Sequence, residues 1–174
     1  MSKFDNIDAD KAKDIIFKVE QSSKKMDEIV DTIIITYVEE LDNYVAHIDE
    51  RLCDKTNPPN DEELDKFCLN LSSLIYFASS MGERLGIRDD IAKATYKEVY
   101  NTTRDSAEKG TVQDKNTLAE LASQQEQLIS ICYTRAYRIV KAKVDSAQEL
   151  LTSIKKVISR RMQDQQLTNI SGGR

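Results

Sequence analysis

The sequence predicts an all-α protein, an elongated helical bundle with two long helices and two shorter ones, and three observations support this fold class. Residues that break helices are scarce, since the 174 residues include only five Gly and two Pro. Two long stretches, 10–53 and 111–166, contain neither, and in them apolar residues recur every eleven positions. The composition, 40% hydrophobic and 32% charged, is typical of a folded helical chain and not of a disordered one.

The first predicted helix covers residues 10–53. Its apolar side chains form two rows with an eleven-residue spacing: Ile15, Met26, Tyr37 and Ile48 in one, and Val19, Val30, Leu41 and Leu52 in the other. The rows lie four residues apart and therefore share one face of the helix. The β-branched run 33–38 is typical of a strand, which is the alternative for this segment. The repeat passes through the run unbroken, and this favours a helix.

The two shorter helices are expected at residues 61–85 and 89–109. The first of them opens at Asn60, and the acidic residues 61–63 suit the positive end of a helix dipole. We expect Gly86 to end this helix as a left-handed cap, and Gly110 to end the next one in the same way.

The second long helix is expected to run unbroken over residues 111–166. Thr111 and Asp114 form an approximate capping box at its start. Its main apolar row again has the eleven-residue spacing: Leu118, Ile129, Val140, Leu151 and Met162. We expect one helical-bundle domain over residues 1–167 and a flexible tail over 168–174.

The helix lengths constrain the architecture without deciding it. At about 1.5 Å per residue, each long helix spans roughly 65–80 Å. The two shorter helices together nearly match one long helix. The lengths therefore fit either three rods whose middle rod is broken near Gly86, or an up-down-up-down four-helix bundle with overhanging ends.

The sequence contains no recognisable catalytic motif, so we expect a protein that is not an enzyme and that holds no cofactor and no metal. His47 is the single histidine and lies at the edge of the apolar stripe of the first helix, where a partly exposed position is favoured over a catalytic one. Cys53, Cys68 and Cys132 are far apart, without a Cys-x-x-Cys pair. We expect them to be free, buried thiols in a reducing compartment.

Pairs of acidic residues three positions apart are the nearest approach to a metal site: Glu28 with Asp31, Glu39 with Asp42, and Glu62 with Asp65. Such pairs share a helix face and bind Mg²⁺ in all-α nucleotide pyrophosphohydrolases. Those enzymes usually also carry a Glu-x-x-Glu pair, and this sequence has none. A solvated acidic face is therefore favoured, and a Mg²⁺-dependent nucleotide hydrolase is the most distant alternative.

The charge is distributed unevenly along the chain. Residues 1–66 carry a net charge of −9, and residues 133–174 carry +6. Six basic residues of the last helix are candidates for nucleic-acid contact: Arg135, Arg138, Lys155, Lys156, Arg160 and Arg161. Asp145 and Glu149 interrupt this face. A solvated face, or one that pairs with the acidic first helix, is favoured over nucleic-acid binding.

The helix expected at 61–85 has apolar residues on two sides. Leu69 and Tyr76 lie opposite its main apolar face, and Phe77 lies between the two faces. A helix that is apolar nearly all round is normally enclosed. A slender bundle offers little to cover this second face, so either the overhanging ends of the long helices or another subunit covers it. An interface with another subunit, formed by these three residues, is favoured.

Three segments of the last helix carry a resemblance to a known group of proteins. Tyr133-Thr-Arg-Ala-Tyr137, Val144-Asp-Ser-Ala-Gln-Glu-Leu-Leu151 and Ile154-Lys-Lys-Val-Ile-Ser-Arg-Arg-Met162 resemble small uncharacterised all-helical proteins of tailed bacteriophages. Such proteins tend to be encoded near replication and recombination genes. The resemblance implies an accessory role in phage DNA metabolism or virion biology, and it carries no site residue across.

We therefore expect a non-enzymatic helical bundle with coiled-coil features that acts through protein–protein contact, its partner being a second copy of itself. A nucleic-acid-binding accessory protein of DNA replication or recombination is the alternative. No apolar run approaches the roughly 20 residues needed to cross a bilayer, and the first residues lack the basic start and apolar core of a secretory signal. We expect a cytoplasmic protein that does not bind membranes, in the host cytoplasm if a phage encodes it.

Overall fold

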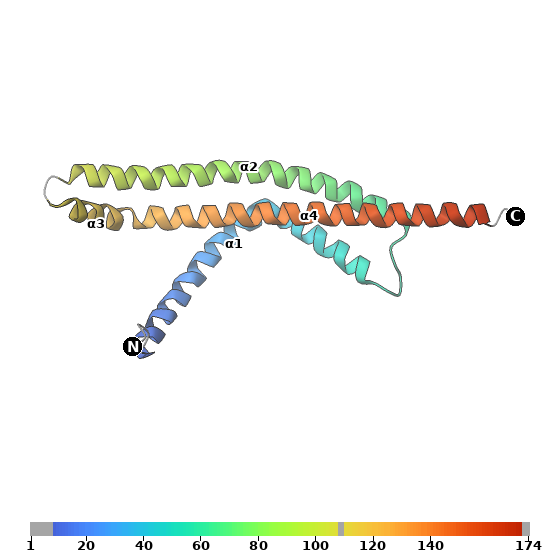
Figure 1. Cartoon of the computed structure of the whole chain (residues 1–174), viewed down its shortest axis with the longest axis horizontal. Helices are drawn as coiled ribbons and strands as arrows, with labels where there is room; N and C mark the ends of the chain where they lie inside the picture. Colours follow the sequence, from blue (N-terminus) through green and yellow to red (C-terminus); the bar gives the residue numbers. More distant parts are fainter. Residues whose placement is uncertain (1–8, 108–109, 172–174) are drawn as a thin grey trace, which may run out of the picture.

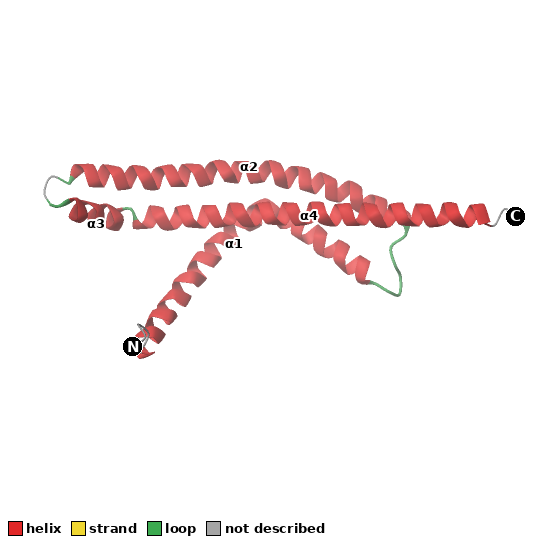
Figure 2. Cartoon of the chain, in the orientation of Figure 1, coloured by secondary structure: helices red, strands yellow, loops and turns green. Residues whose placement is uncertain are grey.

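A computed structural model describes residues 9–107 and 110–171. It contains α1 (Ala9–Cys53), α2 (Asp61–Ser106), α3 (Val112–Ala122) and α4 (Gln124–Ser171). The described residues are 93% helical, and none of them lies in a strand (Figure 2). The predicted fold class, an all-α elongated bundle, is confirmed.

Helices α2 and α4 are antiparallel and lie side by side over most of their length (Figure 1), and their contact is the most extensive in the bundle. Helix α1 crosses them and runs in the same direction as α4, while α3 packs against the far end of α2. The core lies where the three long helices meet. Its fully or almost fully buried side chains include Val38, Leu41 and Ile48 of α1, Leu64, Leu71 and Leu85 of α2, and Ala136, Val140 and Ile154 of α4.

Helix α2 is unbroken, so the predicted break and left-handed cap at Gly86 are wrong. Both Gly82 and Gly86 lie within α2, where it faces α4. A Cβ atom at Gly86 would lie only 3.2 Å from Cε2 of Tyr137. Glycine at this position therefore allows two helices to approach closely, and the helix continues through it. The bundle has three long rods and one short helix.

The interruption falls instead at Ser123, inside the stretch that was predicted to be one helix. Ser123 is fully buried, and both its Oγ and its backbone N–H donate to the carbonyl oxygen of Ala119, at 2.7 and 3.0 Å. A serine that bonds back to the preceding turn competes with the helix ladder and bends the helix. At the other end, α4 extends to Ser171 and so includes residues 168–171 of the predicted tail; residues 172–174 lie outside the described residues.

The turn before α3 matches its prediction in the capping box and in the left-handed glycine, but not in the helix end. Gly110 has a φ of 118°, in the left-handed region that favours glycine. The capping box is confirmed, because Asp114 N donates to Thr111 Oγ1 at 3.2 Å and Thr111 N donates to the Asp114 carboxylate at 2.8 Å. The bonds from Thr111, with its backbone N–H first, hold the pKa of Asp114 below its usual value. The preceding helix α2 ends at Ser106 and its C-cap is Ala107 in an extended conformation, so the predicted end at Lys109 with Gly110 as its left-handed cap is wrong.

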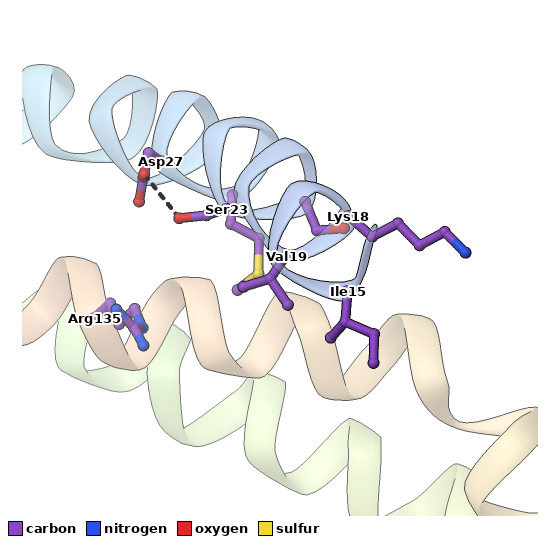
Figure 3. A pocket seen from close by; sticks show the side chains of 8 residues that line it. Ile15, Lys18, Val19, Ser23, Asp27 and Arg135 are labelled. Carbon is purple, nitrogen blue, oxygen red and sulfur yellow. Dashed lines mark hydrogen bonds between the residues drawn. The ribbon is translucent and has the colours of Figure 1, made fainter. Parts of the chain in front are cut away.

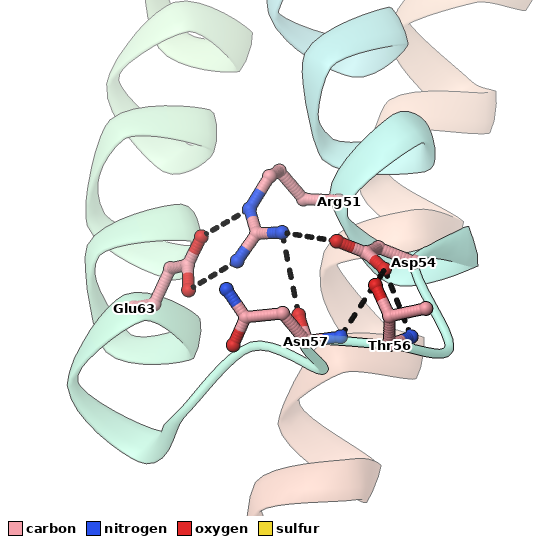
Figure 4. Close-up of polar contacts among 5 residues, drawn as sticks. All are labelled: Arg51, Asp54, Thr56, Asn57 and Glu63. Atoms are coloured by element: carbon pink, nitrogen blue, oxygen red, sulfur yellow. Dashed lines mark hydrogen bonds and ion pairs between the residues drawn. The ribbon is translucent and has the colours of Figure 1, made fainter.

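The end of α1 is tied to the start of α2 through one guanidinium group (Figure 4). Arg51 donates to both carboxylate oxygens of Glu63, at 2.7 and 3.0 Å, and also to Asp54 at 3.3 Å. The hydrogen bond from Arg51 lowers the pKa of Glu63. The side chain of Asn60 accepts from Glu63 N at 2.8 Å, which confirms the predicted start of this helix. The second half of α1 is thus anchored at its end.

Helices α2 and α4 are joined by a buried carboxylate. Asp89 is 4% exposed, and it accepts from Thr134 Oγ1 and from Lys93 Nζ, both at 2.6 Å. Burial acts to raise the pKa of Asp89, but the hydrogen bonds from Lys93 and Thr134 outweigh it, so the pKa is lowered. The ionised Asp89 therefore holds α2 and α4 in register.

Candidate interaction surface

The first part of α1 leaves the bundle as a separate arm, which we define as residues 13–29. Every side chain from residue 13 to residue 25 is exposed. Ile15 and Val19, which belong to the two apolar rows, are 62% and 61% exposed. The same rows are buried from Val30 to Ile48, while Leu52 at the end of α1 is 39% exposed. Figure 1 shows the arm diverging from α4 toward the N-terminus. The predicted apolar face of α1 is therefore real along its whole length, but it is covered only in its second half.

A wide groove lies between the arm and the start of α4. The larger of its two hollows has a volume of about 880 Å³. Apolar side chains from both helices line it: Met26, Ile29 and Ile33 of α1, and Leu128, Ile129, Cys132 and Tyr133 of α4. The second hollow, of about 450 Å³, adjoins it at Ser22 and Met26 and extends to Ile15, Val19 and Arg135. In Figure 3, Ile15 and Val19 point from the arm toward the α4 ribbon. We call these two hollows together the groove.

Past the groove, toward the C-terminal half of α1, this helix contacts α2. The guanidinium of Arg88 lies 5.8 Å from the centre of the Tyr37 ring, within range of a cation–π contact. Beyond this point, toward the N-terminus, α4 and the arm separate (Figure 1). The groove is therefore a V-shaped space with apolar walls and an open end.

The predicted interface residues Leu69, Tyr76 and Phe77 form a second exposed apolar patch. They are 72%, 71% and 59% exposed, so the fold does not cover them. Tyr76 and Phe77 contact each other edge to face, with ring centres 5.5 Å apart. A hollow of about 240 Å³ lies next to Phe77, between α1 and α2. The assignment of this patch as a subunit interface stays a prediction.

The six candidate nucleic-acid-binding residues are spread along α4 and are not brought together. Arg135 and Arg161 are separated by about 39 Å of helix at 1.5 Å per residue. Arg135 lines the groove. Arg161 donates to the Asp61 carboxylate and to the carbonyl oxygen of Pro59, both at 2.9 Å. Arg138 lies close enough to Asp89 to help lower its pKa. Lys155, Lys156 and Arg160 are exposed.

The acidic pairs occupy the positions that the helical count predicts. Glu28, Asp31 and Glu39 are exposed, and Asp42 accepts a hydrogen bond from Lys143 at 2.6 Å. Glu62 is paired with Lys66 at 2.7 Å. Within residues 9–107 and 110–171, no three His, Cys, Asp or Glu side chains are grouped in a way that could hold a metal ion.

His47 lies at the surface, and the three cysteines differ in their exposure. His47 is exposed and meets the ring of Phe67 edge on, 6.0 Å between ring centres. Cys132 is buried and Cys68 half-buried, and desolvation raises the pKa of both thiols. Cys53 is exposed, so the expectation of a buried thiol is wrong there, because Cys53 is the last residue of α1 and borders the loop.

No known protein family, curated protein or solved structure matches this chain. Among the described helices, none combines the length and the apolar character that a membrane span requires. The resemblance to bacteriophage proteins thus stays a prediction.

The groove is the feature that the sequence did not reveal. Four of its lining residues, Ile15, Val19, Met26 and Ile129, belong to the predicted apolar rows, whereas Ile29, Ile33, Cys132 and Tyr133 do not. The one sequence signal is the polar segment Gln21-Ser-Ser23 in the middle of the arm, which places small polar side chains on and beside the apolar stripe. Two small polar side chains in an apolar face reduce what a neighbouring helix gains by covering it.

Proposed function

We propose that this chain is a non-enzymatic helical-bundle protein that acts through protein–protein contact, with the groove as its main contact surface. One observation carries the proposal: an arm with an exposed apolar stripe stands apart from the bundle. Helices in proteins draw most of their stability from packing an apolar face, and the apolar face of the arm is exposed. A partner helix in the groove supplies that packing.

The size and lining of the groove support a macromolecular partner. Its walls are two helix faces with exposed aliphatic side chains, including Ile15, Val19 and Ile29 on the arm and Leu128 and Ile129 on α4. An amphipathic helix that lies in an apolar groove is a recurrent mode of recognition. Exposed apolar patches of this extent on soluble proteins usually mark interaction sites.

The biological setting that we propose, an accessory or structural protein of a bacteriophage, rests on the resemblance of α4 alone. Nucleic-acid binding is less well supported, because Arg161 is engaged by Asp61 and the other basic residues are distributed along the helix.

Photocrosslinking tests the proposed contact surface. A photoreactive amino acid replaces Ile29 or Leu128 in the groove, and Leu167, exposed near the end of α4, serves as the matched control. On irradiation in the producing cell, the groove positions should give a discrete protein adduct, and the control position should give none. Adducts at Leu69 or Tyr76 alone would move the contact surface to the second patch. The absence of adducts at all of these positions would overturn the proposal.

A further inference from the structure

The charges that border the arm's apolar stripe indicate which protein lies in the groove. At about 100° per residue, Lys18 and Lys25 lie on one edge of the stripe. Glu20 and Asp27 lie on the other edge. Each edge has one exception: Asp14 on the basic edge, and Lys13, seven residues before Glu20, on the acidic edge. The arm therefore has one basic and one acidic border, with apolar side chains between them.

Such a helix is complementary to a parallel copy of itself. When two identical helices pair in parallel, the basic edge of each meets the acidic edge of the other. When they pair antiparallel, the basic edge of one helix meets the basic edge of the other, and the two acidic edges also meet. Like charges then face each other. In the parallel pair, Lys18 lies near Glu20 of the other copy, and Lys25 near Asp27. Charged borders of this kind set partner choice and orientation in coiled coils.

The centre of the stripe is compatible with the same arrangement. Its apolar residues Ile15, Val19 and Met26 are separated by Ser22. A small side chain in the middle of a helix–helix contact allows the backbones to approach closely. In a parallel pair each of these residues meets its own counterpart, so Ile15 packs on Ile15 and Ser22 on Ser22.

The overall geometry allows this pairing. Helices α1 and α4 run in the same direction and diverge toward the N-terminus (Figure 1). A two-fold axis along that direction would place the arm of a second copy within the V and parallel to the first arm. Leu128 and Ile129 of α4, 44% and 53% exposed, would then face the inserted arm. Four apolar helix segments, two arms and two α4 starts, would enclose one core.

We propose that the occupant of the groove is the arm of a second copy of this chain, in parallel orientation about a two-fold axis. This inference rests on the proposed function and names its partner. It adds an orientation and a set of residues to the expected self-association, and it places the interface away from the Leu69 patch.

The first test measures mass in solution by sedimentation over a series of protein concentrations. The wild type should reach twice the chain mass of 19.8 kDa. The double variant Ile15→Asp, Val19→Asp should remain at the single-chain mass, with the folded core retained because both residues are outside it. The control Leu167→Asp should associate like the wild type, and Leu69→Asp should do so as well.

The second test measures orientation by disulfide formation under mild oxidation, in a background in which Ser replaces the exposed Cys53. Ile15→Cys should link to itself between copies, because a parallel pair brings the two residues within disulfide distance. Antiparallel pairing would instead link Ile15→Cys to Met26→Cys in a mixture of the two variants, and Ile15→Cys alone would not react.

The outcomes separate this inference from the proposed function. A wild type that stays a single chain, or a dimer that survives Ile15→Asp, Val19→Asp, overturns the second copy as occupant. If the photocrosslinker at Ile29 then captures a different protein, the proposed function stands and only its partner changes. If a single-chain wild type gives no adduct at Ile29 or at Leu128, the inference and the groove both fail. A mixed Ile15–Met26 disulfide keeps the second copy and overturns the parallel orientation.

Discussion

The two halves of α1 carry the same apolar pattern in opposite surroundings. In the second half, Val30, Leu41 and Ile48 are buried between α2 and α4. In the first half, Ile15 and Val19 continue the same rows and are mostly exposed. The eleven-residue repeat determines which face of a helix is apolar. Whether that face is covered depends on the angle at which the helices cross, and the sequence pattern does not encode this angle.

Polar contacts also differ between the two halves. The second half is fixed to α2 by the Arg51–Glu63 pair and to α4 by Lys143–Asp42. In the arm, Ser23 donates to Asp27 of the same helix at 3.2 Å (Figure 3). The side-chain pairs that join α1 to α2 and α4 at these positions therefore lie in its second half.

The largest expected change in the free energy of unfolding comes from a comparison of one apolar residue in each half of α1. Ile48→Ala should lower the free energy of unfolding by about 2–5 kcal/mol, because it leaves a cavity in a fully buried site. Ile15→Ala should change it by less than about 0.5 kcal/mol at low protein concentration, where chains are separate. Urea unfolding followed by circular dichroism measures both. Equal losses for the two variants would mean that the arm packs on the bundle in solution.

The next effect concerns the charge that joins α2 to α4 beside the groove. Asp89→Asn should lower the free energy of unfolding by about 1.5–3 kcal/mol near neutral pH, since it weakens hydrogen bonds to a buried carboxylate. The exposed neighbour Asp90 is the control, and Asp90→Asn should have little effect.

The same variant has a defined pH dependence. The pKa of Asp89 is lower in the folded protein than in the unfolded chain. Its stabilising contribution is therefore complete above the unfolded pKa, near pH 4, and is lost as the pH falls through the folded pKa. The stability difference between wild type and Asp89→Asn should shrink in that acid range. A difference that stays constant down to pH 2 would contradict the assignment.

Much of this fold follows from the sequence, and its departures have identifiable physical causes. The start of α2 at Asn60 and the capping box at Thr111 were predicted because capping depends on residues close in sequence. The prediction for Gly86 was wrong because the sequence around a glycine does not show which role the glycine has. A glycine that ends a helix and a glycine that leaves room for a side chain of a neighbouring helix, here the Tyr137 ring, look alike in sequence. Ser123 gave no signal, since its hydrogen bond to the preceding turn is compatible with an unbroken helix pattern.

The surface was predicted less completely than the fold. Leu69 and Tyr76 were correctly placed away from the core, because one helix face can be read from periodicity alone. The groove was missed, because it depends on the angle between two helices that are distant in sequence. The basic residues of α4 were found individually, while the engagement of Arg161 by Asp61 depends on α2 and α4 lying antiparallel.

A moderate effect tests the continuity of α2. Gly82→Ala should raise the free energy of unfolding by about 0.5–1 kcal/mol, because alanine favours helix and its Cβ would lie 3.5 Å from Val140, an ordinary contact. Gly86→Ala should gain less, since the Tyr137 ring must shift to admit the Cβ. Thermal unfolding of the two variants gives the comparison. A loss of more than about 1 kcal/mol for Gly86→Ala would mean that the Tyr137 ring cannot shift to admit the Cβ.

The smallest effect concerns the ion pair that joins the acidic first helix to the basic last one. Lys143 Nζ lies 2.6 Å from the Asp42 carboxylate, and both side chains are partly exposed, at 37% and 41%. Because solvent screens such pairs, a double-mutant cycle with Lys143→Ala and Asp42→Ala should give a coupling of about 0.2–1 kcal/mol. The coupling should fall as salt is added. Lys141 is the control, since it lies about 200° around the helix from Lys143 and should show no coupling to Asp42.

The Lys143–Asp42 pair decides between two explanations of the uneven charge along the chain. A measurable coupling means that the opposite charges of the chain neutralise each other within the second half of α1. A coupling of zero would leave the positive charge of α4 available to an anionic partner and would strengthen the nucleic-acid alternative.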